Sequence, residues 1–95
     1  MLNGLSIAIG YILAFINTYP FRNPMQIAEI ENMFIQEQFR KHGVGKRLMH
    51  AVLDELSKRN IKRLKVESIA QNSEAIHFYK KCGFKEFNIL LETDL

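Results

Sequence analysis

An internal disulfide is excluded, because Cys82 is the only cysteine among the 95 residues of this chain. A lone thiol fits a reducing compartment, and its simplest interpretation is a small, half-buried apolar residue. Two prolines and five glycines are too few for a flexible linker or a low-complexity tract. Together with the chain length, these absences predict one small domain over residues 1–95.

Long hydrophobic runs are also missing. The most apolar stretch, Leu5–Ile16, is too short to span a bilayer, has no basic region before it and lacks a small-residue cleavage site. Its β-branched and aromatic residues favour a buried strand. We therefore expect a soluble, cytoplasmic protein without membrane partners.

Neither sign of charge dominates, since the net charge is only +3 and basic and acidic residues alternate on the first predicted helix. A nucleic-acid binder would show a basic stripe with exposed aromatics, so nucleic acid is not an expected partner. The histidines, His42, His50 and His77, have no metal-ligand spacing with carboxylates or with Cys82, so no metal is expected.

What the chain does contain is a glycine loop flanked by cations, Arg40-Lys41-His42-Gly43-Val44-Gly45-Lys46-Arg47. Its glycines allow close approach of a ligand and positive φ, and the helix predicted behind them directs free N–H groups at the same place. These features indicate a phosphate or pyrophosphate site. The alternative is a helix-entry turn with a solvated basic rim, because the loop matches neither the P-loop nor the dinucleotide fingerprint.

Hydrophobic periodicity and turn residues predict six elements in the order β-β-α-β-α-β. This order predicts an α/β (α+β) domain with helices packed on a mixed sheet and a parallel strand pair across the first helix. A turn is expected at Asn3-Gly4, a cap at Asn72 or Ser73, and a helix stop at Gly83. The predicted strands are Leu5–Asn17, Gln26–Ile35, Ile61–Ile69 and Phe84–Leu95, and the predicted helices are Val44–Lys58 and Glu74–Lys81.

A second motif lies between Asn72 and Phe84, in the form Asn-x-x-Ala-x-x-Phe-Tyr-x-x-x-Gly-Phe. Upstream stands Arg40-x-x-Gly43-x-Gly45. With these two motifs in this order, the chain resembles the GNAT superfamily of acetyl-CoA-dependent N-acetyltransferases from roughly Leu5 to Leu95. The resemblance implies a GNAT-like acyl-CoA N-acyltransferase fold, with acetyl-CoA as co-substrate and a primary amine as acceptor.

The resemblance also implies roles for individual residues. Backbone amides of Phe34 and Ile35 would hold the thioester carbonyl and the pantetheine arm, Asn72 would hydrogen-bond the pantetheine, and Tyr79 would lie beside the sulfur. The pyrophosphate would be held by Arg40, Lys41, His42, Gly43, Val44, Gly45 and Lys46.

The chemistry of aminolysis suits these residue types. Charge develops on the thioester oxygen, which backbone N–H groups stabilise, and the leaving thiolate benefits from an acid such as Tyr79. Glu31 and Glu29, on one face of the second predicted strand, are the candidate bases, with Glu31 nearer the site. The alternatives are a Tyr79 ring that only packs in the core and carboxylates that face solvent or pair with cations.

Compared with family members, this chain has no counterpart of their N-terminal strand and of the two helices that follow that strand. The acceptor therefore stays open, although Glu29, Glu31 and Glu67 would suit a cationic one. We expect a homodimer that covers the edge of Leu5–Asn17. The competing interpretations are a non-catalytic acetyl-CoA-binding regulatory module and, less favoured, a nucleic-acid or protein interaction domain.

Overall fold

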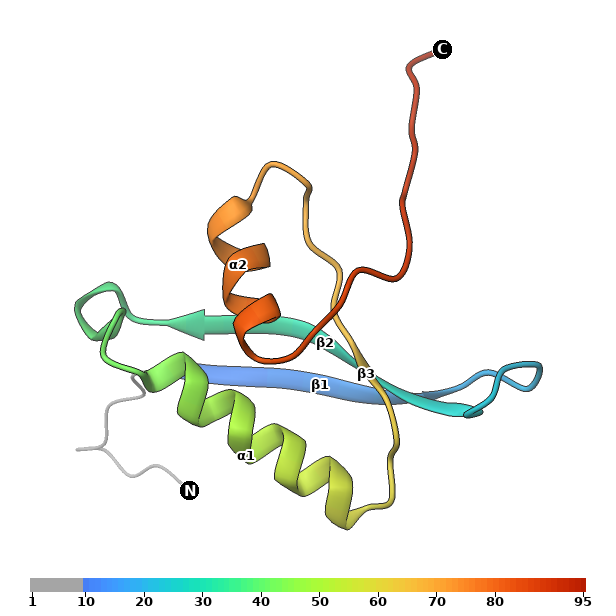
Figure 1. Ribbon diagram of the computed structural model, residues 1–95, viewed down its shortest axis with the longest axis horizontal. Coiled ribbons are helices and arrows are strands. Elements are labelled where there is room, and N and C mark those ends of the chain that lie inside the picture. Colours follow the sequence, from blue (N-terminus) through green and yellow to red (C-terminus); the bar gives the residue numbers. More distant parts are fainter. Residues whose placement is uncertain (1–9) are drawn as a thin grey trace, which may run out of the picture.

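The structure is a computed structural model that describes residues 10–95 (Figure 1). The second strand and the first helix have the bounds predicted from the sequence. The Asn3-Gly4 turn and the first residues of the predicted N-terminal strand lie outside the described residues. The elements are β1 (Gly10–Thr18), β2 (Gln26–Ile35), the 3-10 helix η1 (Glu37–Phe39), α1 (Val44–Lys58), β3 (Leu64–Lys65) and α2 (Ser73–Lys81).

The described strands form one mixed sheet in the order β1-β2-β3. β1 pairs with β2 in the antiparallel sense from Gly10 to Thr18. β3 pairs with β2 in the parallel sense, at Ala28 and Glu29 of β2 only. The parallel pair predicted across the first helix is thus confirmed, but it is short.

A β-bulge interrupts the long antiparallel pair. Leu13 lies opposite Asn32 while Ala14 lies opposite Ile30, so Glu31 is an extra residue of β2 without a partner on β1. Simple alternation therefore fails at this point of the strand.

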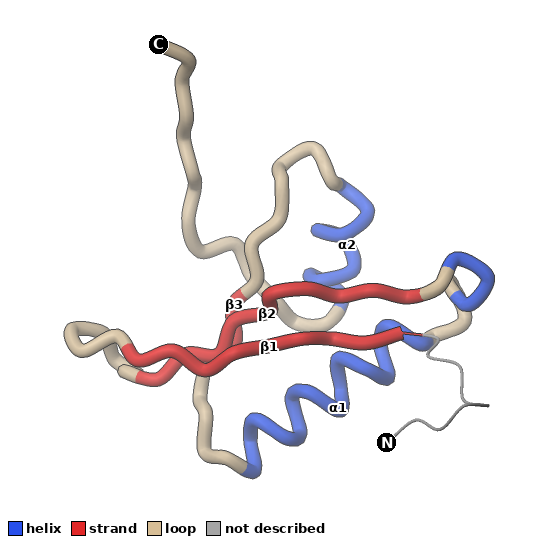
Figure 2. The backbone as a smooth tube through the Cα atoms, turned by 180° about the vertical axis from the view of Figure 1, so that it is seen from behind, coloured by secondary structure: helices blue, strands red, loops and turns tan. Residues whose placement is uncertain are grey.

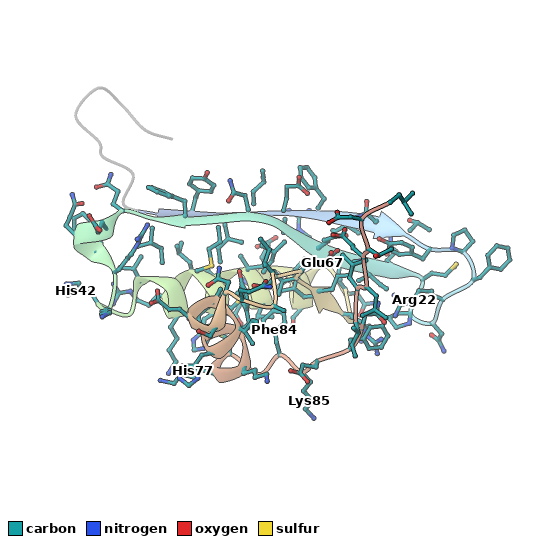
Figure 3. The ribbon with its side chains drawn as sticks, turned by 90° about the horizontal axis from the view of Figure 1, so that it is seen from above. Arg22, His42, Glu67, His77, Phe84 and Lys85 are labelled. Carbon is teal, nitrogen blue, oxygen red and sulfur yellow. The ribbon has the colours of Figure 1, made fainter. Side chains whose placement is uncertain are left out.

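Both helices pack on the same face of the sheet, as Figure 3 shows edge-on and Figure 2 shows from behind. Val44 and Met49 of α1 are buried against this face, because the apolar residues of the helix recur at helical spacing. Within residues 10–95, no helix is both long and apolar enough to cross a bilayer. The buried apolar side chains are Ile27, Ala28, Ile30, Val44, Met49 and Ile61.

The opposite face of the sheet carries exposed apolar side chains. Tyr11, Leu13 and Phe15 of β1 are 44%, 45% and 51% exposed. The ring of Tyr11 lies 5.9 Å from that of Phe34, its cross-strand partner, and Asn32 donates a hydrogen bond to the Tyr11 hydroxyl at 3.1 Å. The expectation of a buried first strand is therefore wrong for its described part, because no residue of β1 is buried.

The two other predicted strands are largely absent. Of Ile61–Ile69 only Leu64–Lys65 is a strand, and residues 84–95 form no strand at all. Their residues have the composition of strands, but a strand exists only where a neighbour accepts its backbone hydrogen bonds. Every residue from Lys85 to Leu95 is exposed, and this segment projects from the body of the molecule (Figure 1).

Candidate active site

The glycine loop is tied to the end of β2. The Arg40 Nε donates a hydrogen bond to the Ile35 carbonyl at 3.0 Å, which folds the loop back onto the last residue of the strand. Lys41 and Gly43 both have positive φ, 65° and 77°. His42 marks the loop at one end of the molecule, far from the hairpin that carries Arg22 (Figure 3).

The loop leads directly into α1, and the first N–H groups of this helix have no acceptor within the helix. Gly43 is the N-cap residue, and its carbonyl accepts the first helical bond from the Arg47 N–H at 3.1 Å. The amides of Val44, Gly45 and Lys46 have no acceptor within the helix, and none of them donates to a backbone carbonyl of residues 10–95. The first turn holds no acidic residue. An anion therefore meets free N–H groups, the positive helix end and cationic side chains together.

The two glycines of the loop serve different purposes. A Cβ on Gly43 would meet nothing within 4 Å, so this glycine is required by its left-handed backbone. A Cβ on Gly45 would lie 3.0 Å from the Ile35 side chain and 3.2 Å from Met33 and Phe78. Gly45 thus lets α1 approach both β2 and α2, a packing role that the sequence did not reveal.

On its β3 side, β2 is open beyond Glu29. β3 pairs with Ala28 and Glu29 and then departs, so the half of β2 that ends at Phe34 and Ile35 has no described partner on this edge. Figure 1 shows the chain leaving β2 after β3 and rising to α2. The two parallel strands therefore diverge after Glu29, and alternate backbone N–H groups of this half of β2 are left for a ligand.

Helix α2 begins beside this opening. The Asn72 Oδ1 accepts a hydrogen bond from the Ala75 N–H at 3.2 Å, so Asn72 rather than Ser73 is the cap. The helix ends as predicted, with Gly83 at φ 100°. Because the cap uses the side-chain oxygen, the Asn72 amide nitrogen is the group that remains for a ligand.

Tyr79 is half-buried on α2, between two other rings. Its ring centroid lies 5.6 Å from those of both Phe78 and Phe84. Burial, and to a lesser extent the neighbouring Cys82, raise the pKa of the Tyr79 phenol. The ring packing that the sequence offered as an alternative is real, and the hydroxyl makes no hydrogen bond to any residue in 10–95. A protonated phenol is therefore available.

Cys82 connects this helix electrostatically to the loop. Burial raises the pKa of the Cys82 thiol, and the positive charge of Lys46 acts against that rise. Lys46 is therefore close enough to α2 for its charge to be felt there. A thiol with a raised pKa is a poor nucleophile, and the half-buried Cys82 fits the role expected from sequence.

The candidate bases have different surroundings. Glu29 forms an ion pair with the Lys65 Nζ at 3.5 Å, and this ammonium also lies 5.1 Å from the Tyr19 ring centroid. A hydrogen bond with Tyr19 is the main cause that raises the pKa of Lys65. Glu31 is exposed at the bulge and has no ion pair within the described part of the chain. Nothing in the sequence marked Lys65, because its place opposite Glu29 depends on the strand register.

Glu67 lies after β3, exposed, in the segment that leaves the sheet (Figure 3). Across residues 10–95, no three histidine, cysteine or carboxylate side chains gather as a metal site would require.

Comparison with known proteins identifies this arrangement. Residues 6–84 match the Acetyltransferase (GNAT) family. The L-ornithine N5-acetyltransferase of Arabidopsis thaliana is 36% identical over 91 residues, which cover 93% of this chain and 39% of that protein. The [ribosomal protein bS18]-alanine N-acetyltransferase of Escherichia coli K12 is 34% identical over 62 residues, which cover 65% of this chain and 42% of that protein. The chain thus spans less than half the length of these relatives.

A solved structure gives the same fold. The aminoglycoside N-acetyltransferase AAC(6')-Iy, in complex with the bisubstrate analogue CoA-S-monomethyl-acetylneamine, superposes with a TM-score of 0.80 at 21% identity, over 98% of this chain and 65% of that one. Because the family match extends over most of the chain and contains both the glycine loop and the α2 motif, this chain belongs to the GNAT family of acetyltransferases, and its mixed sheet with helices is a GNAT fold.

Proposed function

We propose that this protein is an N-acetyltransferase that transfers acetyl from acetyl-CoA to a primary amine by direct attack of the amine on the thioester. One observation carries the proposal. The open N-terminus of α1 and the unpaired edge of β2 meet at a loop that holds four cations, Arg40, Lys41, Lys46 and Arg47.

The extended coenzyme fits this opening in one direction. Its pyrophosphate would lie against the amides from His42 to Lys46, with Arg40 already anchored beside them. From there the pantetheine would follow the free edge of β2 toward Phe34 and Ile35 and meet the Asn72 amide nitrogen. This placement brings the thioester between β2 and α2, within reach of the helix that carries Tyr79.

The transfer needs one bond made and one broken. The lone pair of a neutral amine attacks the acetyl carbonyl carbon, and the C=O π pair moves onto oxygen, where β2 amides stabilise the charge. The intermediate then collapses, and the C–S bond breaks with its electron pair on sulfur. The amine loses one proton and the thiolate gains one, so the products are an N-acetyl amine and coenzyme A.

Tyr79 is suited to support the leaving sulfur as a hydrogen-bond donor. An ordinary phenol has a pKa about 1.5 above that of a thiol, or about 2 kcal/mol, and burial of Tyr79 widens the gap. Full proton transfer from the phenol to the thiolate is therefore uphill. We propose that Tyr79 stabilises the developing thiolate through its O–H. The thiolate then takes up the proton that the amine has released.

Glu31 is the better candidate for accepting that proton, directly or through water. The charge of Glu29 is already paired with Lys65, whereas Glu31 is free of ion pairs in the described chain and stands at the bulge. Exposed carboxylates at Glu31 and Glu67 would also attract a cationic acceptor before it is deprotonated. The names of the relatives mention ornithine, an alanine of a ribosomal protein and an acetylneamine, which suits a cationic amine as the acceptor class here.

Calorimetric titration with acetyl-CoA tests the cofactor site, with Gly43→Asp as the disruptive variant. Gly83→Asp is a matched control, because both glycines have positive φ and open space at the Cβ position, but Gly83 ends α2. We expect Gly43→Asp to abolish binding and Gly83→Asp to retain it. Equal affinities for both variants, or no binding by the unmodified protein, would refute the site.

Turnover with a panel of cationic amines then separates an enzyme from a binding module. We expect Tyr79→Phe, which removes one hydrogen-bond donor to the developing thiolate, to lower kcat by about a hundredfold while the affinity for acetyl-CoA is kept. Tyr11→Phe, on the bare face of the sheet, is the control and should leave kcat unchanged. Tight acetyl-CoA binding without turnover on any amine would favour the non-catalytic regulatory module instead.

A further inference from the structure

Residues 58–65, which lead from the end of α1 into β3, are the most basic segment of the chain. No acidic residue stands between Glu55 and Glu67. The cations of the segment are Lys58, Arg59, Lys62, Arg63 and Lys65. Runs of this density are typical of surfaces that contact phosphate polymers.

The fold brings a further cation to this segment. The Phe87 ring centroid lies 5.2 Å from the Arg22 guanidinium and 5.9 Å from that of Arg63. Arg22 belongs to the hairpin between β1 and β2, and this hairpin lies at the same end of the molecule as the chain between α1 and β3 (Figure 1). Two like charges thus share one aromatic neighbour, although like charges repel each other.

The charge at this end is only partly compensated. Two of the five cations in residues 58–65 form ion pairs, at 2.9 and 3.5 Å, with carboxylates of α1 and β2. Arg22, Lys62 and Arg63 form no ion pair with any residue in 10–95. We call these three residues the basic cluster. A bound anion would gain from the attraction and would also relieve the repulsion among the three cations.

A cavity of about 430 Å³ opens beside the basic cluster, with Lys62 in its wall. The polar groups that line it are the hydroxyl of Thr18 and the side-chain amides of Asn23, Gln26 and Asn60. These amides make no hydrogen bond to another residue in the described part of the chain. Amide and hydroxyl groups offer donors as well as acceptors. The cavity therefore suits a ligand group that carries both.

We propose that this end of the molecule binds single-stranded RNA. The basic cluster neutralises phosphates, and the cavity receives a base, whose edge presents donors and acceptors together. The 2′-hydroxyl of RNA is likewise both a donor and an acceptor. Phe21, next to Arg22 in the hairpin, is fully exposed, and a ring in this position stacks on a base.

Other polyanions fit this surface less well. The side chains of an acidic peptide and the headgroup of an anionic lipid present mainly acceptors, which leaves the amide oxygens of the cavity unused, and neither stacks on Phe21. A duplex keeps its bases stacked and away from the cavity. Cations interleaved with exposed aromatics, which the sequence did not show as one stripe, are assembled here from the hairpin and residues 58–65.

This surface is separate from the cofactor site. The hairpin that carries Arg22 and the glycine loop marked by His42 lie at opposite ends of the molecule (Figure 3). The inference therefore goes beyond the proposed acetyltransferase activity, and RNA and acetyl-CoA can be bound at the same time.

Fluorescence anisotropy of a labelled, unpaired RNA of about 12 nucleotides, titrated with the full chain, tests the proposal. Three phosphate contacts predict that the logarithm of the association constant falls with the logarithm of the salt concentration with a slope of about −2. Arg22→Gln/Lys62→Gln/Arg63→Gln should weaken binding by about tenfold and bring the slope close to zero. No binding by the unmodified chain at about 50 mM salt would overturn the proposal.

A variant of the glycine loop is the matched control. Lys41→Gln/Lys46→Gln/Arg47→Gln removes the same number of charges, and should bind acetyl-CoA more weakly but RNA as well as the unmodified chain. The cluster variant should bind acetyl-CoA normally, which also shows that its fold is intact and separates this result from the test of the cofactor site. A larger loss of RNA affinity in the loop variant than in the cluster variant would refute the proposed surface.

The base contact is tested separately. Phe21→Ala should weaken RNA binding by about fivefold or more, and Phe15→Ala, an exposed ring on β1, should not change it. A DNA oligomer of the same sequence should bind more weakly than the RNA. Equal affinities for RNA and DNA would overturn the assignment to RNA. Tighter binding of polyglutamate or of phosphatidylserine vesicles than of RNA would assign the surface to an acidic peptide or a membrane instead.

Discussion

The two edges of β2 differ in how much of their length is paired with a neighbouring strand. Toward β1 the strand is paired along its full length, with one bulge, and toward β3 it is paired at Ala28 and Glu29 only. The paired half of the strand contains Ile27 and Ala28, which are fully buried, and the other half ends at the glycine loop. The first half supplies stability and the second supplies free backbone groups. A site for an extended ligand is thus built by ending strand pairing early on one side.

The largest effect is expected from the paired half. Ile27 has no exposed surface, so Ile27→Ala should lower the free energy of unfolding by about 2–5 kcal/mol through lost burial and a cavity. Ile16→Ala is the matched control on β1, where the side chain is 41% exposed and the cost should be clearly smaller. Urea unfolding measures both. Equal losses would mean that burial in the paired half of β2 does not determine its contribution to stability.

The next effect belongs to the loop. Gly45→Ala places a methyl group 3.0–3.2 Å from Ile35, Met33 and Phe78, and overpacking of this kind costs about 1–3 kcal/mol. Gly43→Asn should cost much less, because asparagine tolerates the left-handed region and the space is open. Thermal unfolding of both variants checks the order. The reverse order would show that backbone strain, rather than packing, determines the stability of this end of the molecule.

Loss of the α2 cap should cost about 1 kcal/mol. Asn72→Ala removes the acceptor of the Ala75 N–H, whereas Asn72→Asp keeps an acceptor at the same place. We expect the alanine variant alone to lose stability in urea unfolding, and both variants to bind acetyl-CoA more weakly, since neither has the side-chain nitrogen. Unchanged affinity in the aspartate variant would restrict Asn72 to its capping role.

Alkaline pH should weaken the fold through α2. The pKa values of Tyr79 and Cys82 are raised in the folded chain, mainly by burial. Their neutral forms stabilise the fold fully below the pKa of the unfolded chain, and this contribution is lost as the pH rises through the folded pKa. The free energy of unfolding should therefore fall from about pH 9 upward.

Urea titrations at several pH values test this slope, with Tyr79→Phe/Cys82→Ser as the variant that should flatten it. Lys65, whose pKa is also raised, remains in that variant and should keep a residual slope of the same sign. A slope identical in the two proteins would assign the alkaline loss to other groups.

The smallest effect is expected at the last paired residue of β2. The Glu29–Lys65 pair is partly exposed, so Lys65→Gln should cost less than about 1 kcal/mol. The Lys65→Gln variant is to be compared with Arg59→Gln, which breaks the ion pair of Arg59 with Glu55 on the surface of α1. If Lys65→Gln alone changes the affinity for acetyl-CoA, the ion pair helps to set where the strands diverge.

The sequence predicted the helices and β2 well, because their signals are local. Helical spacing from Val44 to Lys58 and the asparagine cap with Gly83 determine where each helix begins and ends. The strands predicted after Ile61 and Phe84 were wrong beyond Leu64–Lys65, since composition does not show whether a neighbouring strand is available.

For the candidate site, too, local patterns could be predicted from the sequence and contacts between distant residues could not. The glycine loop and the Tyr79 motif were visible as patterns, and the structure brings their elements together through Gly45 and Phe78. The contact of Gly45 with both β2 and α2, the pairing of Lys65 with Glu29 and the influence of Lys46 on Cys82 all join residues that are distant in the sequence. No local sequence pattern predicts such contacts, so only the three-dimensional structure reveals them.

The bulge of β2 has a consequence for how this chain can vary. The residues of β2 that pair with helix-facing positions of β1 continue in phase on either side of the bulge, and Glu31 is one residue more than that phase needs. Its deletion would leave every other side chain of the strand on its present face. The alternation of the strand thus does not depend on Glu31, whose side chain is exposed.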